Sequence, residues 1–309
     1  MASRIRPILL LLGSLFVASA IRAEPVYRLD LHRTFQPGDV YRHSVAVARS
    51  GTASSGTSVD FEEAPVSASY VYRARIEVVA VDAAGLPLRE IHRDASLVAR
   101  DEGRRRQMLP DGTVLRVRYR RSGAEFVRDG EPMDRRLTQV MRELVPLHRK
   151  NATFAAMIEP PGPVSAGDRW EIDGEAAGRH LRPTGLRVIE TGEGGYARLA
   201  GVVEELSGPM LEIRFALPLA WVELDLPPNA SLGESWGWYE GSYRVPLDGS
   251  SEGSVARTQL RFTMQGVFVR SGLLSRPRPW EIASRAARVE RRWNPSARTG
   301  RSPLDVAAR

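Results

Sequence analysis

The feature that most constrains the fold is a two-residue alternation of side chains, which begins near residue 27 and recurs along the chain. It is clearest where small or apolar residues take every second position: Ala68, Tyr70, Tyr72, Ala74, Ile76 and Val78. Successive side chains of a β-strand point to opposite sides, so this period is typical of a half-buried strand. The sequence therefore predicts a mainly β protein, an antiparallel meander that forms curved sheets or a two-lobed β-barrel or sandwich.

Turn signals and one helical period interrupt this alternation. Pro110-Asp111-Gly112 and Asp129-Gly130 predict turns between strands. Residues 134–148 instead space their apolar side chains by three and four positions: Leu137, Val140, Met141, Leu144 and Val145, with His148 last. This spacing predicts one mid-chain amphipathic helix, with Asp134 as its N-cap.

The predicted domain organisation follows from composition. Pro160-Pro161-Gly162-Pro163 is a stiff connector, so we expect a β-rich lobe at 24–158, ending in the helix, and a second β-rich lobe at 159–275. Residues 276–309 form an arginine-rich, basic C-terminal tail. Within the tail four side chains fall on one helical stripe, which predicts a short helix at 280–293: Ile282, Ala286, Val289 and Trp293. Residues 294–309 are predicted to be disordered.

The first 23 residues have the pattern of a secretory signal peptide. Arg4 and Arg6 precede an apolar stretch from Ile8 to Val17, and Ala18-Ser19-Ala20 or Ala23 can serve as the cleavage site. The sequence thus predicts an exported protein, periplasmic or extracellular, in a bacterium. No later apolar run approaches the ~18 residues of a membrane span, so we expect no transmembrane segment in the mature chain. The absence of cysteine excludes disulfides and cysteine nucleophiles.

The chain is strongly basic, with 44 Lys and Arg against 37 Asp and Glu and a formal net charge of +7. Nearly all of the positive charge is arginine, which binds phosphate and carboxylate groups through two parallel hydrogen bonds. In the tail, the candidate contacts with an anionic surface are Arg285, Arg288, Arg291 and Arg292. The expected compartment argues against nucleic acid as a partner.

No motif in the sequence predicts catalysis. Gly233-Glu234-Ser235-Trp236-Gly237 and the segment 249–253 match the Gly-x-Ser-x-Gly nucleophile elbow, but neither precedes a helical pattern. All five histidines also come before both serines, which is the wrong order for an α/β-hydrolase. The histidines show no metal-binding spacing. We therefore predict no catalytic, cofactor-binding or metal-binding residues, and no cofactor.

The most distinctive residues are aromatic and cluster in the last third of the chain: Trp221, Trp236, Trp238, Tyr239 and Tyr243. On a β surface such side chains form a platform for a ligand or for a membrane interface. They are also the largest bodies available to fill a core, and the alternation places Trp236 and Trp238 opposite Tyr239. Both interpretations remain open at this point.

Three short segments share one form, a glycine, an acidic residue, any residue and an aromatic residue: Gly38-Asp39-Val40-Tyr41, Gly167-Asp168-Arg169-Trp170 and Gly233-Glu234-Ser235-Trp236. The glycine would supply a turn, and the acid would accept a hydrogen bond from nearby backbone. With the signal peptide, the helix and the proline-rich link, this plan resembles families of uncharacterised secreted bacterial β-rich proteins over residues 27–270. Those families have no assigned activity, so the resemblance implies no site residue.

Three functional hypotheses follow. The first is an exported, non-catalytic binding protein that holds an apolar or lipid-like ligand in a curved β-sheet. The second is an envelope-associated structural or interaction protein that contacts anionic surfaces through its arginine-rich tail. The third is a hydrolase, which the missing motifs disfavour.

Overall fold

The computed structural model describes residues 25–29, 31–32, 34–56, 62–101, 103–120, 123–145, 153–182, 186–205, 208–224, 226, 229–247, 253–268 and 278–293. The strands within these ranges are β1 (Val26–Tyr27), β2 (Val40–Ser55), β3 (Glu62–Val81), β4 (Pro87–Asp101), β5 (Arg104–Arg120), β6 (Gly123–Arg128), β7 (Glu131–Pro132), β8 (Val164–Ser165), β9 (Arg169–Glu171), β10 (Arg187–Thr191), β11 (Tyr196–Glu205), β12 (Gly208–Glu223), β13 (Ala230–Pro246), β14 (Gly253–Phe268) and β15 (Arg278–Trp293). The helices are α1 (Arg135–Leu144), α2 (Phe154–Ile158) and α3 (Gly174–Leu181).

Thirteen of these strands form one antiparallel sheet, in the order β7-β6-β5-β4-β3-β2-β15-β14-β13-β12-β11-β9, with β10 attached to β12. The first and last long strands meet in the middle, where β2 pairs with β15 from Ser55–Trp280 to Arg42–Trp293. We call this pairing the seam, β2–β7 the first half and β9–β15 the second half. A mainly β, antiparallel, curved sheet is thus confirmed, and its two outermost strands are the short β7 and β9.

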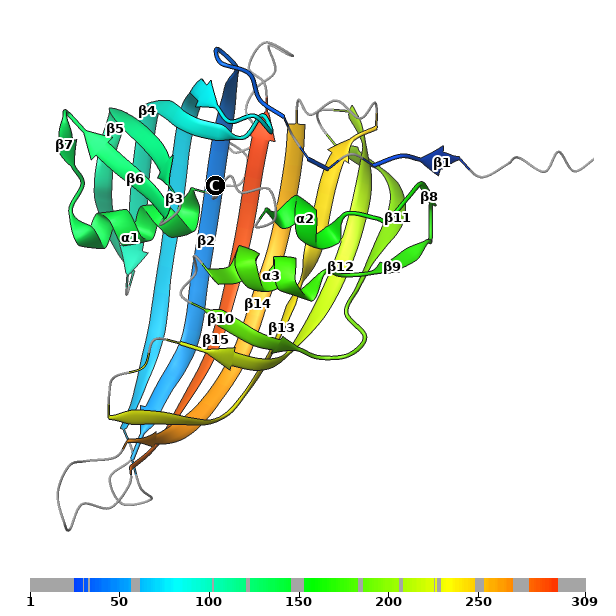
Figure 1. Ribbon diagram of the computed structural model, residues 1–309. Helices are drawn as coiled ribbons and strands as arrows, with labels where there is room; N and C mark the ends of the chain where they lie inside the picture. Colours follow the sequence, from blue (N-terminus) through cyan, green and yellow to red (C-terminus); the bar gives the residue numbers. More distant parts are fainter. Residues whose placement is uncertain are drawn as a thin grey trace, which may run out of the picture.

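Figure 1 shows the three helices in front of one face of the sheet, which we call the inner face; the opposite face is the outer face. The long strands converge toward the lower end of the figure, near Ser55, Phe268 and Arg278, and we call this the tapered end. Close to it, the last part of β12 and the start of β13 sweep across in front of the other strands. The sheet is therefore rolled over its own inner face.

Glycines permit this strong curvature where neighbouring backbones come very close. A Cβ built on Gly241 would lie 2.1 Å from the carbonyl oxygen of Arg257 on the adjacent strand. One built on Gly266 would lie 2.0 Å from the carbonyl oxygen of Ser231 and 2.6 Å from the ring of Trp280. No other residue type fits at these distances, so the glycines act as the bending points of the sheet.

The inner face carries two hydrophobic clusters, one in each half. The first is built on Tyr41, Tyr72, Leu97 and Leu115 and is covered by α1. The second contains residues of α2 and α3, with Phe215 and Tyr239 of the sheet. Alternation produces both clusters, because every second side chain of β2 to β5 and of β11 to β14 points inward. Whether the two lobes are separate domains remains a prediction.

The predicted mid-chain helix is confirmed as α1. Asp134 caps it by accepting a hydrogen bond from the backbone N–H of Leu137 at 2.9 Å, and Leu137, Met141 and Leu144 are buried. His148 lies outside the described residues. Two further helices, α2 and α3, were not predicted, because each is too short to show a periodic pattern.

The turn chemistry of the first two repeated segments is confirmed. Gly38 and Gly167 both have φ +94°. Asp39 accepts from the backbone N–H of Gln36 at 2.9 Å, and Asp168 accepts from that of Ser165 at 2.7 Å. The third segment differs, since Gly233 lies within β13 at a shift in its register with β14.

Two local predictions were wrong. Residues 280–293 form no helix but belong to β15, the strand that joins the two halves of the sheet. Their side chains alternate between the two faces, and the backbone hydrogen-bonds to β2 and β14, which outweighs the weak helical stripe. Pro110-Asp111-Gly112 does not reverse the chain but bulges within β5, between the pairs Leu97–Leu109 and Ala95–Thr113. The predicted signal peptide and residues 294–309 lie outside the described residues.

In the described ranges, none of the helices has the length and apolar character needed to cross a membrane.

Candidate functional site

Titratable side chains gather on the inner face, and the first group surrounds Glu90 on β4. Its carboxylate accepts from the hydroxyls of Tyr41 at 2.9 Å and Tyr119 at 2.6 Å. His92 places Nε2 3.1 Å from the same carboxylate and Nδ1 2.7 Å from the hydroxyl of Tyr72. With the proton on Nε2, His92 donates to Glu90 and accepts from Tyr72, so every polar group of this Glu90 cluster has a partner.

A second group lies at the seam around Glu290 of β15. Arg288 and Arg292 both donate to its carboxylate, at 2.7 and 2.8 Å, and Nε2 of His43 lies 3.1 Å from it. Burial alone would raise the pKa of Glu290, but the two guanidinium groups and His43 hold it well below its usual range. Burial also lowers the pKa of His43 to about 4, so this imidazole is neutral at pH 7. We call these four residues the seam cluster.

The seam cluster also holds α1 in place. Arg288 donates to the backbone carbonyls of Glu143 at 2.5 Å and Leu144 at 3.2 Å, in the last turn of α1. Arg49 of β2 donates to the side chain of Glu143 at 2.7 Å. A cation at the carboxyl end of a helix satisfies carbonyls that lack intrahelical partners. Strand β15, which comes late in the sequence, therefore holds helix α1 of the first half in place.

The second half carries an aromatic cluster under α2 and α3. The ring centroid of Phe215 lies 5.2 Å from that of Phe154 and 5.2 Å from that of Tyr239. Nε2 of His180 lies 3.1 Å from the hydroxyl of Tyr239. Burial, reinforced by Arg288, lowers the pKa of His180 to about 4. This histidine is thus a neutral packing and hydrogen-bonding group at pH 7.

These clusters contain acids and bases but no accessible nucleophile. Glu90 and His92 are 1% and 0% exposed, so a substrate has no contact with either. Ser235, the serine of the Gly-x-Ser-x-Gly match, is buried in β13, and its hydroxyl accepts from the backbone N–H of Val222 at 2.9 Å. Among the described residues, no group of histidine, aspartate and glutamate side chains could hold a metal ion. The arrangement suits a structural role for the buried charges.

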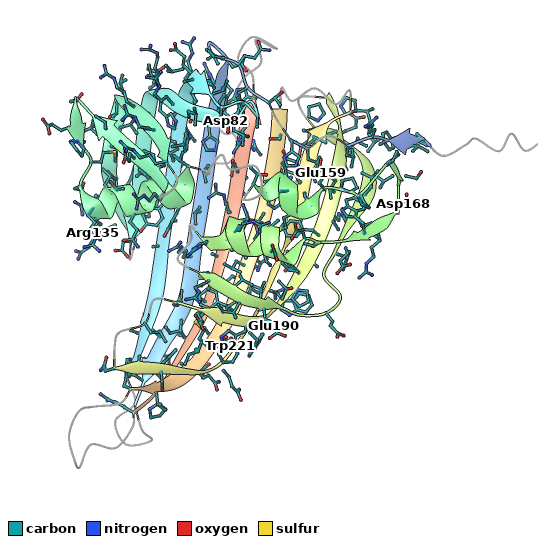
Figure 2. All side chains as sticks on the ribbon, in the orientation of Figure 1. Asp82, Arg135, Glu159, Asp168, Glu190 and Trp221 are labelled. Carbon is teal, nitrogen blue, oxygen red and sulfur yellow. The ribbon has the colours of Figure 1, made fainter. Side chains whose placement is uncertain are left out.

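The structure distributes the five predicted aromatic residues over both faces. Trp236 and Trp238 lie on the outer face of β13 and are 56% and 42% exposed. Tyr239 and Tyr243 point to the inner face, where Tyr239 is buried in the second cluster. Trp221 is partly buried on β12, beside Glu190 of β10 (Figure 2), and its indole N–H donates to Glu223 at 3.3 Å. The five therefore do not form one platform.

The four predicted arginines are divided in the same way, because they alternate along β15. Arg288 and Arg292 point to the inner face and belong to the seam cluster. Arg285 and Arg291 lie on the outer face, where Arg285 is exposed opposite Arg261 and Arg291 lies opposite Val255. They do not form one basic surface on a free tail.

An open apolar region, which sequence reasoning missed, occupies the inner face at the tapered end. Three inward positions of β2 and β3 carry small residues: Gly51, Ala53 and Ala68. Across the seam lie apolar side chains that are only partly buried: Phe262, Phe268, Ile282 and Ala286, with Leu224, Leu226 and Leu232 on the segment that runs from the end of β12 into β13. We call this set the open apolar surface. Small residues in a strand do not by themselves predict a binding surface. Only the register with β15 shows that these residues lie beside the partly buried apolar side chains.

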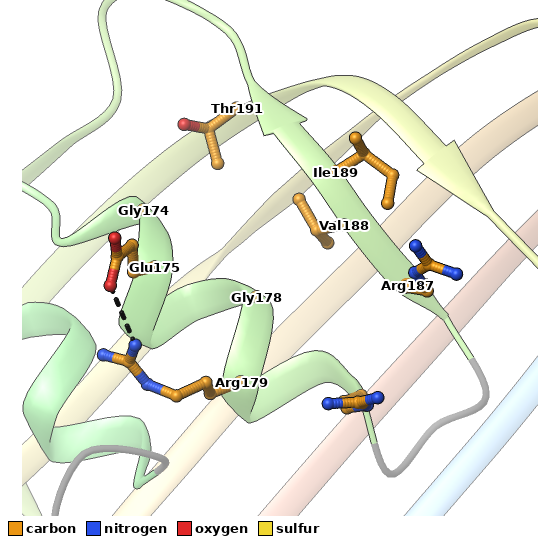
Figure 3. Close-up of a pocket in the computed structure, with 9 residues that line it drawn as sticks. Gly174, Glu175, Gly178, Arg179, Arg187, Val188, Ile189 and Thr191 are labelled. Carbon is orange, nitrogen blue, oxygen red and sulfur yellow. Dashed lines mark hydrogen bonds and ion pairs between the residues drawn. The ribbon is translucent and has the colours of Figure 1, made fainter.

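A groove of about 730 Å³ lies between α3 and β10 (Figure 3). Two glycines of α3, Gly174 and Gly178, face β10, and a Cβ on Gly174 would lie 2.8 Å from the hydroxyl of Thr191. The glycines thus allow the helix to approach the strand closely. Arg179, whose side chain pairs with Glu175 at 3.0 Å, stands on the rim (Figure 3). The groove is shallow and open to solvent, and it contains no buried polar group.

Comparisons with known proteins place the chain in no family. No family model matches the sequence, and no curated protein matches it. Among solved structures, the chain aligns with lipovitellin, in a structure titled "Lipid-protein interactions in lipovitellin". The alignment has 13% identity and a TM-score of 0.33, and it covers 87% of this chain but 27% of the lipovitellin chain. An alignment at this TM-score supports no conclusion about function.

Proposed function

We propose that this protein is an exported, non-catalytic binding protein that holds an apolar, lipid-like ligand against the open apolar surface. The observation that carries the proposal is the group of partly buried apolar side chains that lies next to short side chains of β2 and β3 at the tapered end. Gly51 and Ala53 lie opposite Ser284 and Ile282 in the β2–β15 register, and neither residue has a side chain that reaches beyond Cβ. Ile282, and Phe262 and Phe268 on the next strand β14, are only partly buried.

Burial supports the same conclusion. Met264 and Trp280 are 0% and 5% exposed on the inner face near the tapered end. Phe262 and Phe268, on the same strand as Met264, are not fully covered. Each fully buried aromatic side chain gains roughly 1.5–3 kcal/mol relative to an exposed one. An apolar ligand lying on β2 and β3 would complete this burial, which is a driving force for binding.

Native mass spectrometry of the protein recovered from a bacterial periplasm tests the proposal. We expect an extra mass that is lost when the protein is denatured. Ala53→Phe should remove that mass, because the ring would occupy the space above β2. Ala48→Phe, on the outer face of the same strand opposite Ala287, is the matched control and should retain it. A bare protein mass in the unchanged chain, or an extra mass that survives Ala53→Phe, would overturn the proposal.

A further inference from the structure

The outer face of β2–β5 carries an unusual density of exposed arginine. Six of these side chains have no ion pair with any residue in the described part of the chain, and we call them the arginine array: Arg42, Arg73, Arg75, Arg89, Arg116 and Arg118. Two more arginines of this face are paired, Arg93 with Glu77 at 3.0 Å and Arg120 with Glu125 at 2.8 Å. Of the eight arginines named here, two are thus paired with a glutamate.

The register brings like charges directly together. Arg75 of β3 pairs with Arg42 of β2 on one side and with Arg93 of β4 on the other, so three arginines stand in one row across three strands. Arg89 of β4 pairs with Arg118 of β5. Directly opposed side chains have Cβ atoms about 5 Å apart, and like charges in this position are destabilising. Within the described residues Arg42, Arg75, Arg89 and Arg118 have no ion pair, whereas Arg93 pairs with Glu77.

Apolar side chains stand among the arginines. Leu88 at the start of β4 and Val114 of β5 are 42% and 44% exposed, and Val79 of β3 is 37% exposed. A cationic face interspersed with aliphatic side chains is the pattern of a surface that rests on a membrane interface. The array also extends over four strands, so its charges spread in two dimensions.

We propose that the outer face of β2–β5 docks on an anionic lipid bilayer. Each guanidinium group can donate two parallel hydrogen bonds to a headgroup phosphate, and headgroups between the strands would separate the opposed arginines. Leu88 and Val114 would enter the boundary between headgroups and acyl chains. The inner face, with the helices and the open apolar surface, would then point away from the membrane plane, since it lies on the other side of the sheet (Figure 1).

Vesicle flotation tests this docking. The exported protein is mixed with vesicles of phosphatidylglycerol and phosphatidylcholine in a ratio of about one to two, or with vesicles of phosphatidylcholine alone. We expect binding to the anionic vesicles only, and its loss at high salt. The triple variant Arg75→Gln, Arg116→Gln, Arg118→Gln should bind at least about tenfold more weakly. All variants share one N-terminus, so any affinity that comes from residues 1–23 is common to them.

The matched control removes three outward arginines of the second half: Arg198→Gln, Arg261→Gln and Arg285→Gln. It has the same net charge as the array variant and includes one directly opposed pair, Arg261 and Arg285. We expect its binding to stay within about twofold of the unchanged protein. Equal losses in the two variants would overturn the proposal, because they would reflect net charge alone. A loss confined to the control would also overturn it, since the contact would then lie in the second half.

A second pair of variants separates a bilayer from a soluble polyanion. Leu88→Asn with Val114→Asn should weaken binding to anionic vesicles and leave binding to heparin unchanged, because only a membrane takes up the aliphatic side chains. Binding to heparin without binding to vesicles would overturn the assignment of a bilayer. The thermal midpoint of the array variant should equal or exceed that of the unchanged protein, which excludes unfolding as the cause of lost binding.

Discussion

The outer faces of the two halves differ in how many of their arginines have a carboxylate partner. In the second half, Arg244 pairs with Glu205 and with Glu212 at 2.6 Å, Arg214 pairs with Glu212 at 2.8 Å, and Arg261 pairs with Glu240 at 2.7 Å. In the first half, the row Arg42, Arg75 and Arg93 sets cations directly beside one another. The formal net charge of +7 is therefore not spread evenly over the molecule. On the outer face of the first half, the six arginines of the array have no ion pair with any described residue.

The charges of the seam cluster differ from both outer faces, because they are largely covered and because Arg288 and Arg292 both pair with Glu290. We expect Glu290→Ala to have the largest effect on stability, a loss of about 3–5 kcal/mol in the free energy of unfolding. The reason is that Arg288 and Arg292 would lose their counterion. Chemical denaturation measures it. Glu281→Ala on the outer face of the same strand should cost less than about 0.5 kcal/mol. Similar losses in the two variants would show that the seam cluster has no special weight.

The seam cluster should respond to acid, whereas the exposed arginines keep their charge as the pH falls. Burial holds the folded-state pKa of His43 at about 4, below its ordinary value of 6.5, so the unfolded chain takes up the proton first. The stabilisation that neutral His43 gives the folded state is complete above pH 6.5 and is lost as the pH falls toward 4. Glu290 acts in the same direction below its ordinary value of 4.5, because its folded pKa is depressed.

We expect the free energy of unfolding to fall by roughly 3 kcal/mol through His43 between about pH 7 and pH 4. His180 adds to this loss, because burial lowers its pKa in the same way. His43→Gln should reduce the slope of stability against pH, which urea denaturation at several pH values measures. An unchanged slope in this variant would mean that His43 does not control the acid sensitivity.

The sequence predicted the alternation, the mainly β class and α1 with its Asp134 cap, because these depend on local patterns. It did not predict β15. The inward positions of that strand carry charged residues, Arg288, Glu290 and Arg292. The apolar side chains that usually alternate along a half-buried strand are therefore missing there. Their partial burial is tolerated because each arginine contacts Glu290 and because His43 also contacts it. His43 belongs to a strand more than 200 residues earlier in the chain. Such partners depend on register, which one sequence does not reveal.

The candidate sites illustrate the same limit. The five aromatic residues are close in sequence, but alternation divides Trp238 from Tyr239 and sends them to opposite faces. Gly51 and Ala53 carry no chemical signal, and only their position beside Ile282 and Ser284 makes them part of the open apolar surface. The arginine array was equally hidden, since Arg42, Arg75 and Arg93 become neighbours only through the pairing of three strands.

The smallest expected effect tests the comparison of the two outer faces most directly. Arg75→Glu would place a carboxylate between Arg42 and Arg93, and we expect it to raise the free energy of unfolding by about 0.2–1 kcal/mol, because two repulsive cross-strand contacts become attractive. Arg214→Glu in the second half should act in the opposite direction, since it would remove the ion pair with Glu212 on the same strand and place a like charge beside that carboxylate. Urea denaturation of both variants at neutral pH measures the difference. If Arg75→Glu destabilises the fold as much as Arg214→Glu does, the arginines of the first half have intramolecular partners after all, and the array loses its basis as a surface kept for an outside anion.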